Sequence, residues 1–151
     1  MTGHRLAADY ATAAALLTLG GVVAIVVGLI TDSGETVVGI ALTAVVAAAI
    51  FWLAIFRPQV EKLLRELSPA PAALEVAPGA LSPPDLRDVG IVVVIIALTF
   101  LSPAVSGLLF GMAVANVGRL LRVRSWERET GRVAARVGTG TRARYVAAAA
   151  G

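Results

Sequence analysis

Residues able to carry out acid–base or metal chemistry are few in this sequence, and they are scattered. The 151 residues include one histidine, His4, and no cysteine. Metal sites need clustered ligands, and general acid–base catalysis needs paired titratable groups in a cleft. We therefore expect no catalytic, cofactor-binding or metal site, and no enzymatic activity. The carboxylates instead fall in polar segments, at Asp32, Glu35, Glu61, Glu66, Glu75, Asp85, Asp88, Glu127 and Glu129.

Two further polar residues lie inside or beside long apolar segments. Asn116 is deep in such a segment, and we expect its amide to hydrogen-bond across a helix interface. A substrate contact is the alternative role for Asn116. Asp9 stands at the edge of an apolar segment near Arg5, where an aspartate costs little, so it does not indicate a proton-coupling carboxylate.

The composition is that of an integral membrane protein. Hydrophobic residues make up 58% of the chain and charged residues 15%, against about 25% charged in soluble domains. Residues 10–30 and 36–56 are uncharged, and each stretch is long enough to cross the hydrocarbon core as a helix. A cleaved signal peptide is the alternative for the first stretch, but its apolar region is too long. These features exclude a soluble enzyme and predict a first transmembrane hairpin over residues 1–56, with a tight polar turn at 31–35.

A third uncharged stretch, residues 89–118, is too long for one comfortable span. A single helix would be about 45 Å long and would need an unusual tilt. Ser102 followed by Pro103 is typical of a helix start, so we expect two short spans, 86–101 and 103–121. Residues 86–121 would then form a second hairpin. A single helix kinked at Pro103 is the alternative.

Charge supports four spans with both termini inside. All 13 basic residues then lie on one side, as the positive-inside rule requires. Abundant alanine, valine, glycine and arginine fit a G+C-rich bacterial genome. We thus predict an all-α integral membrane protein of the bacterial cytoplasmic membrane. Its four transmembrane helices form two hairpins, and amphipathic helices lie on the cytoplasmic surface.

The cytoplasmic parts comprise residues 57–85 and 122–151. Residues 58–67 have apolar and charged residues on opposite faces, which predicts an amphipathic helix on the membrane surface, and a Pro/Ala-rich linker follows. In the basic tail, 123–137 is predicted as an interfacial helix, with disorder after residue 138. A small β-hairpin turning at 129–132 is the alternative. The predicted surface for anionic lipid headgroups or a partner consists of Arg124, Trp126, Arg128, Arg132 and Arg136.

Small residues recur at four-residue spacing in the predicted spans, which lets helices approach closely. The predicted packing positions are Gly20, Gly28, Gly107, Gly111 and Asn116.

These features favour a non-enzymatic accessory or scaffold subunit that contacts anionic lipid and a membrane-protein partner or a second copy of itself. The alternative is a homo-oligomeric pore or small transporter, as a holin would be. A conducting path needs polar residues in the spans, and few are available: Thr18, Thr43, Thr99, Ser106 and Asn116. Nothing in the basic tail requires a nucleic acid as partner.

Overall fold

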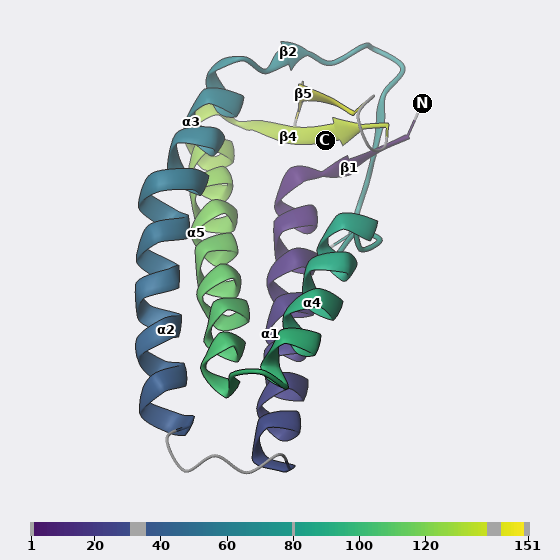
Figure 1. Ribbon diagram of the computed structural model, residues 1–151. Coiled ribbons are helices and arrows are strands. Elements are labelled where there is room, and N and C mark those ends of the chain that lie inside the picture. Colours follow the sequence, from purple (N-terminus) through teal and green to yellow (C-terminus); the bar gives the residue numbers. More distant parts are fainter. Residues whose placement is uncertain (1, 31–35, 80, 139–142, 150–151) are drawn as a thin grey trace.

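The computed structural model describes residues 2–30, 36–79, 81–138 and 143–149, and it is mostly helical. Long helices stand side by side, and a small sheet covers one end of them (Figure 1). The predicted turn at residues 31–35 lies outside the described residues. The main helices are α1 (Leu6–Ile30), α2 (Thr36–Ile50), α3 (Arg57–Arg65), α4 (Leu86–Thr99) and α5 (Ser106–Thr130).

Helices α2 and α3 form one continuous rod through a π-helical segment, η1 (Phe51–Phe56). Pro58 explains the wider turn, because it has no N–H for the carbonyl four residues earlier and its ring crowds that carbonyl. The apolar face of α3 buries Val60 and Leu64 in a cluster with Leu6 of α1 and Val123 of α5. The predicted helix at 58–67 is therefore present, but its apolar face packs on protein and it prolongs α2.

The third apolar stretch is broken as predicted. Helix α4 ends at Thr99, and a 3₁₀ turn, η2 (Pro103–Val105), begins directly after the extended Ser102 and leads into α5. A single helix kinked at Pro103 is therefore wrong. Helix α4 has 14 residues and is about 21 Å long, less than a hydrocarbon core of ~30 Å. The described helices that could cross a membrane number three, namely Leu6–Ile30, Val37–Arg65 and Pro103–Thr130.

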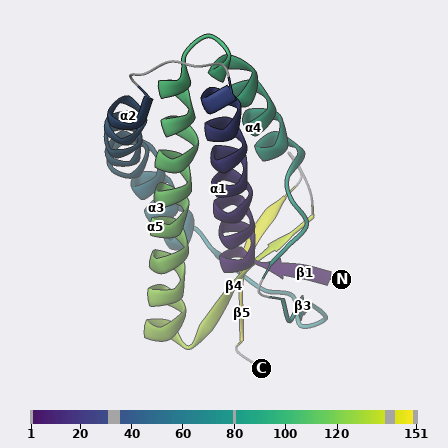
Figure 2. The ribbon, with the colours of Figure 1, turned by 90° about the horizontal axis from the view of Figure 1, so that it is seen from below.

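The helices form an open arc in the order α2, α5, α1, α4 (Figure 2). Helix α5 is central and packs on both α1 and α2, while α4 packs mainly on α1. The core between α1, α4 and α5 contains Leu17, Ala24, Ile95 and Leu109, all buried. Helices α2 and α4 therefore stand at opposite ends of the arc.

Five strands form a sheet at one end of the helices, in the order β2-β5-β4-β1-β3. They come from three distant parts of the chain: β1 (Thr2–Arg5), β2 (Ser68–Pro69), β3 (Glu75–Ala77), β4 (Arg132–Val137) and β5 (Arg144–Ala149). Strand β4 is antiparallel to β1 and β5, whereas β1–β3 and β2–β5 are parallel pairs. We call this sheet and the segment 66–85 the cap.

The cap corrects three predictions made from the sequence. The chain is not all-α; the tail helix ends at Thr130, and residues 144–149 form a strand where disorder was expected. Gly131 ends α5 with a left-handed φ of 65°, a conformation that favours glycine. The alternative of a β-hairpin turning at 129–132 is also wrong, because the chain is helical up to Thr130, and β4 pairs with β5, which follows it in the chain. Strand β4 is buried on both faces, with Ala134 against the helices and Ala135 against Val146, so its apolar residues do not show a helical face.

Candidate functional site

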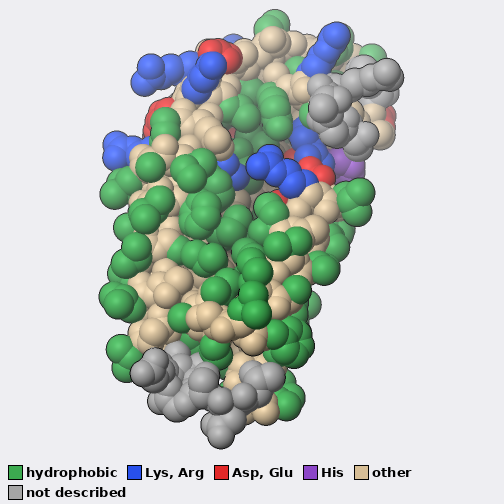
Figure 3. Space-filling view, viewed as in Figure 1, with side chains coloured by type: hydrophobic (Ala, Val, Ile, Leu, Met, Phe, Trp, Pro, Cys, Tyr) green, Lys and Arg blue, Asp and Glu red, His purple; other side chains and the backbone are tan. Residues whose placement is uncertain are grey.

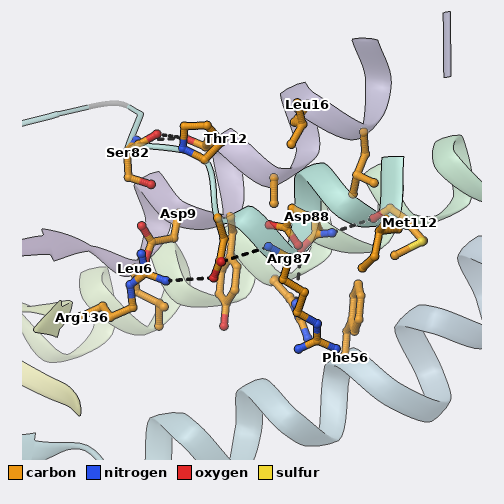
Figure 4. A pocket seen from close by; sticks show the side chains of 18 of the residues that line it. Leu6, Asp9, Thr12, Leu16, Phe56, Ser82, Arg87, Asp88, Met112 and Arg136 are labelled. Atoms are coloured by element: carbon orange, nitrogen blue, oxygen red, sulfur yellow. Dashed lines mark hydrogen bonds and ion pairs between the residues drawn. The ribbon is translucent and has the colours of Figure 1, made fainter. Parts of the chain in front are cut away.

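A cavity of about 490 Å³ lies where the helices meet the cap. Residues of α1, η1, α3, α4, α5 and the cap line it, and Figure 4 shows several of their side chains converging. Charged side chains gather near the level where the apolar surface of the helices ends (Figure 3). The charged residues that line the cavity are Asp9, Asp85, Arg87, Asp88, Arg119 and Arg136.

Arg119 of α5 is half-buried in this cavity and forms no ion pair with a carboxylate of the described residues. Its Nη2 donates to Oε1 of Gln59 at 2.6 Å, and its Nη1 donates weakly to Oδ1 of Asn116 at 3.4 Å. Its Nε is buried and has no hydrogen-bond partner among the described residues. The guanidinium carbon lies 3.4 Å from the ring centre of Phe56 and 5.2 Å from that of Tyr10. Aromatic faces attract a cation but do not neutralise it.

A second cationic group, Arg136 of β4, is paired. Its Nε lies 3.1 Å from Oδ2 of Asp9, and its Nη1 lies 3.7 Å from Oδ2 of Asp85. The Asp9–Arg136 contact is electrostatic, because neither carboxylate oxygen of Asp9 accepts an aligned hydrogen bond from a described group. It links the first turns of α1 to the central strand of the cap.

The start of α4 forms one rim of the cavity. Asp85 caps the helix, since its Oδ1 accepts from the backbone N–H of Arg87 at 3.2 Å. Burial raises the pKa of the neighbouring Asp88 carboxyl above its usual range, and the charge of Asp85 raises it further. Ser82, just before this helix, is tied to α1 by two hydrogen bonds with Thr12, of 2.9 and 3.0 Å.

Away from the cap the cavity becomes apolar. Leu16, Leu17, Ile91 and Met112 line this part, and the buried core of α1, α4 and α5 closes it below. The buried hydroxyls farther along the bundle, those of Thr99 and Ser106, donate to backbone carbonyls four and three residues earlier, those of Ile95 and Pro103. The described residues of one chain therefore offer no continuous polar path through the bundle.

The predicted basic surface does not form one helical face. Arg124 and Arg128 are exposed on α5, Arg132 is exposed on β4, and Arg136 turns into the cavity. Trp126 is half-buried against the cluster beneath the cap.

The predicted packing residues lie at helix contacts. A Cβ on Gly20 would meet Val92 of α4, and one on Gly28 would meet Pro103, while Gly107 and Gly111 face α2. Asn116 is buried, but its amide donates to the carbonyl of Met112 in its own helix, so its hydrogen bonds stay within α5.

Sequence reasoning missed the role of Arg119 in the cavity. It is the first charged residue after a 30-residue uncharged stretch. That position was the available signal, because a long side chain at the end of a span can equally turn inward toward neighbouring helices.

Helix α2 carries the second notable surface. Only 11% of the most apolar window of its rod is buried, against 39% for the other two candidate spans. It packs on α5 and η2, through close contact with Gly107 and Gly111, and exposes a broad apolar face. The large exposed side chains of this face are Val37, Val38, Leu42, Val45, Val46, Ile50 and Leu53.

Comparisons with protein-family models, with curated proteins and with solved structures found no match to this chain.

Proposed function

We propose that this protein is a non-enzymatic accessory or scaffold subunit of the bacterial cytoplasmic membrane. The observation that carries this proposal is the apolar face of α2, which has one main neighbour in the bundle, α5. A lipid-facing helix gains little from apolar contacts alone, so small residues and close packing decide its partners. A transmembrane helix of another membrane protein would pack along Val38, Leu42 and Val45.

The proposed orientation has the cap in the cytoplasm. Strands β1, β4 and β5 lie together at one end of the helices (Figure 1), and the basic residues that the structure describes belong to segments at or near that end. The positive-inside rule favours this side as cytoplasmic. The chain would cross the bilayer with α1, the α2–α3 rod and α5, while the uncharged part of α4 enters as a shorter fourth segment. Arg124, Arg128 and Arg132 are exposed and would contact anionic lipid headgroups.

A pore or small transporter is less well supported. The cavity ends in apolar residues, and the exposed face of α2 offers no ionisable group to line a lumen formed by several copies.

Cysteine cross-linking in native membranes tests the accessory role, because the chain contains no cysteine of its own. Single cysteines at Val38, Leu42 and Val45 would carry a photoactivatable maleimide, and Val94, exposed on α4, would serve as the control position. We expect one cross-linked product of defined mass containing a different membrane protein, formed from the α2 positions and not from Val94→Cys. A product containing only this chain would favour the homo-oligomer, and cross-links to lipid alone would refute both assemblies.

The same approach tests the orientation. A membrane-impermeant maleimide should leave Ala73→Cys in the cap unlabelled in intact cells and label it after lysis, whereas Ser33→Cys should be labelled in both. The reverse pattern would refute the proposed topology.

A further inference from the structure

We propose that the cavity beneath the cap binds one membrane phospholipid, with its phosphate on Arg119 and its acyl chains running along the apolar side of the arc. This site is separate from the proposed partner face on α2 and does not depend on it.

The first argument is the missing counter-charge of Arg119. A guanidinium removed from water is stable when anions and hydrogen-bond acceptors replace the lost hydration. Here Gln59 supplies one good acceptor, Asn116 a weak one, and no described carboxylate forms an ion pair with Arg119. A phosphodiester oxygen near the buried Nε would supply both the negative charge and the absent acceptor.

The second argument concerns the other charges of the cavity. Asp9 is matched by Arg136, which also contacts Asp85, and Asp85 additionally caps α4. Asp88 forms no ion pair with a described residue, and its charge is felt by Arg87, next to it in the first turn of α4, and by Arg119. Arg119 is therefore the half-buried cation of the cavity that forms no ion pair or hydrogen bond with a described carboxylate.

The third argument is the change of polarity along the cavity. The end beneath the cap is charged, and the opposite end is lined by Leu16, Leu17, Ile91 and Met112. The helix surface seen in Figure 3 is hydrophobic below the charged residues. A small anion would fill only the polar end, whereas a phospholipid matches both. Basic pockets between membrane helices on the cytoplasmic side are known to suit lipid headgroups.

The test is native mass spectrometry of the full chain in dodecyl maltoside, after removal of lipid and addition of dioleoylphosphatidylglycerol. We expect one phospholipid bound to each protein at low micromolar lipid. Dioleoylglycerol, which lacks the phosphate, should bind at least tenfold more weakly, because it cannot pair with Arg119. Inorganic phosphate should not compete at millimolar concentration, because it lacks the apolar part.

Variants then locate the site. Arg119→Gln should lower phosphatidylglycerol binding about tenfold, and Arg119→Lys should lower it less, since the charge is kept. Arg65→Gln removes an exposed arginine of α3 outside this cavity and should leave binding unchanged. Equal binding of dioleoylglycerol and phosphatidylglycerol by the wild-type protein would overturn the proposal without any variant. Efficient competition by inorganic phosphate would overturn it in favour of a small anion, and unchanged binding by a folded Arg119→Gln protein would place the lipid elsewhere.

Discussion

Replacing Asp9 by asparagine should destabilise the protein several times more than replacing Glu61 by glutamine. Both carboxylates pair with an arginine far away in the sequence, so the two substitutions are chemically matched. Asp9 joins α1 to the cap through Arg136 at 3.1 Å, and Glu61 joins α3 to α5 through Arg122 at 2.7 Å. The pairs differ in exposure: the side chains are 16% and 11% exposed in Arg136–Asp9, but 31% each in Arg122–Glu61.

The expected magnitudes follow from this difference. Removing one partner of a buried pair costs about 3–5 kcal/mol, because a buried charge is left alone. Arg136 retains Asp85 at 3.7 Å, and the Asp9 contact has no aligned hydrogen bond, so we expect about 2 kcal/mol for Asp9→Asn. Exposed ion pairs contribute about 0.2–1 kcal/mol to stability. Glu61→Gln should therefore cost about 0.5 kcal/mol, although the Arg122–Glu61 distance is the shorter of the two.

The assay is reversible unfolding in mixtures of dodecyl maltoside and sodium dodecyl sulfate. Trp126 packs beneath the cap, so its fluorescence should change when the cap unfolds. A Trp52→Phe background leaves Trp126 as the one tryptophan of the chain. Double-mutant cycles with Arg136→Gln and Arg122→Gln separate each pairwise coupling from the other effects of substitution. Equal coupling energies in the two cycles would refute the argument that burial, and not distance, sets the strength of these pairs.

Two further predictions concern packing and the attachment of the linker. A Cβ on Gly111 would lie 2.5 Å from that of Ala47, so Gly111→Leu should cost about 3 kcal/mol in the same unfolding assay. Gly90→Ala should cost no stability, because a Cβ at this position meets nothing within 4 Å. Equal losses of stability in the Gly111→Leu and Gly90→Ala proteins would contradict the close packing at Gly111. Thr12→Val keeps the shape of the side chain but removes both hydrogen bonds to Ser82, so it should cost about 1–2 kcal/mol and speed amide exchange at Ser82. Thr12→Ser should retain most of the stability, and protection equal to wild type in Thr12→Val would contradict the proposed anchoring.

The parts of the fold that depend on local chemistry were predictable from the sequence. The length of the uncharged stretches alone located α1 and the α2–α3 rod. Ser102 followed by Pro103 located the break before α5, because proline suits the first turn of a helix and not its interior. The length of α4 was overestimated, since the chain leaves the helix at Thr99, before the proline.

The cap was not predictable in the same way. Strand β2 has two residues and β3 has three, so neither carries a periodic pattern of its own. Strand β4 has short apolar residues on both faces, which fits a helix nearly as well as a strand until its partners are known. The surroundings of Arg119 were hidden for a similar reason, because Tyr10 comes from α1, Phe56 from η1 and Gln59 from α3.

The order of the strands has a consequence for biosynthesis. Strand β1 leaves the ribosome first, but its neighbours in the sheet are β3 and β4, and β4 follows the last helix. Pairing of β1 with β4 must therefore wait until the helices have been made and inserted, and non-local pairing of this kind is slow. During that interval the edge of β1 that later pairs with β4 is open to other chains. Because β5 is also part of the cap and its Tyr145 lines the cavity, only a chain translated through Ala149 can complete the cap and the cavity beneath it.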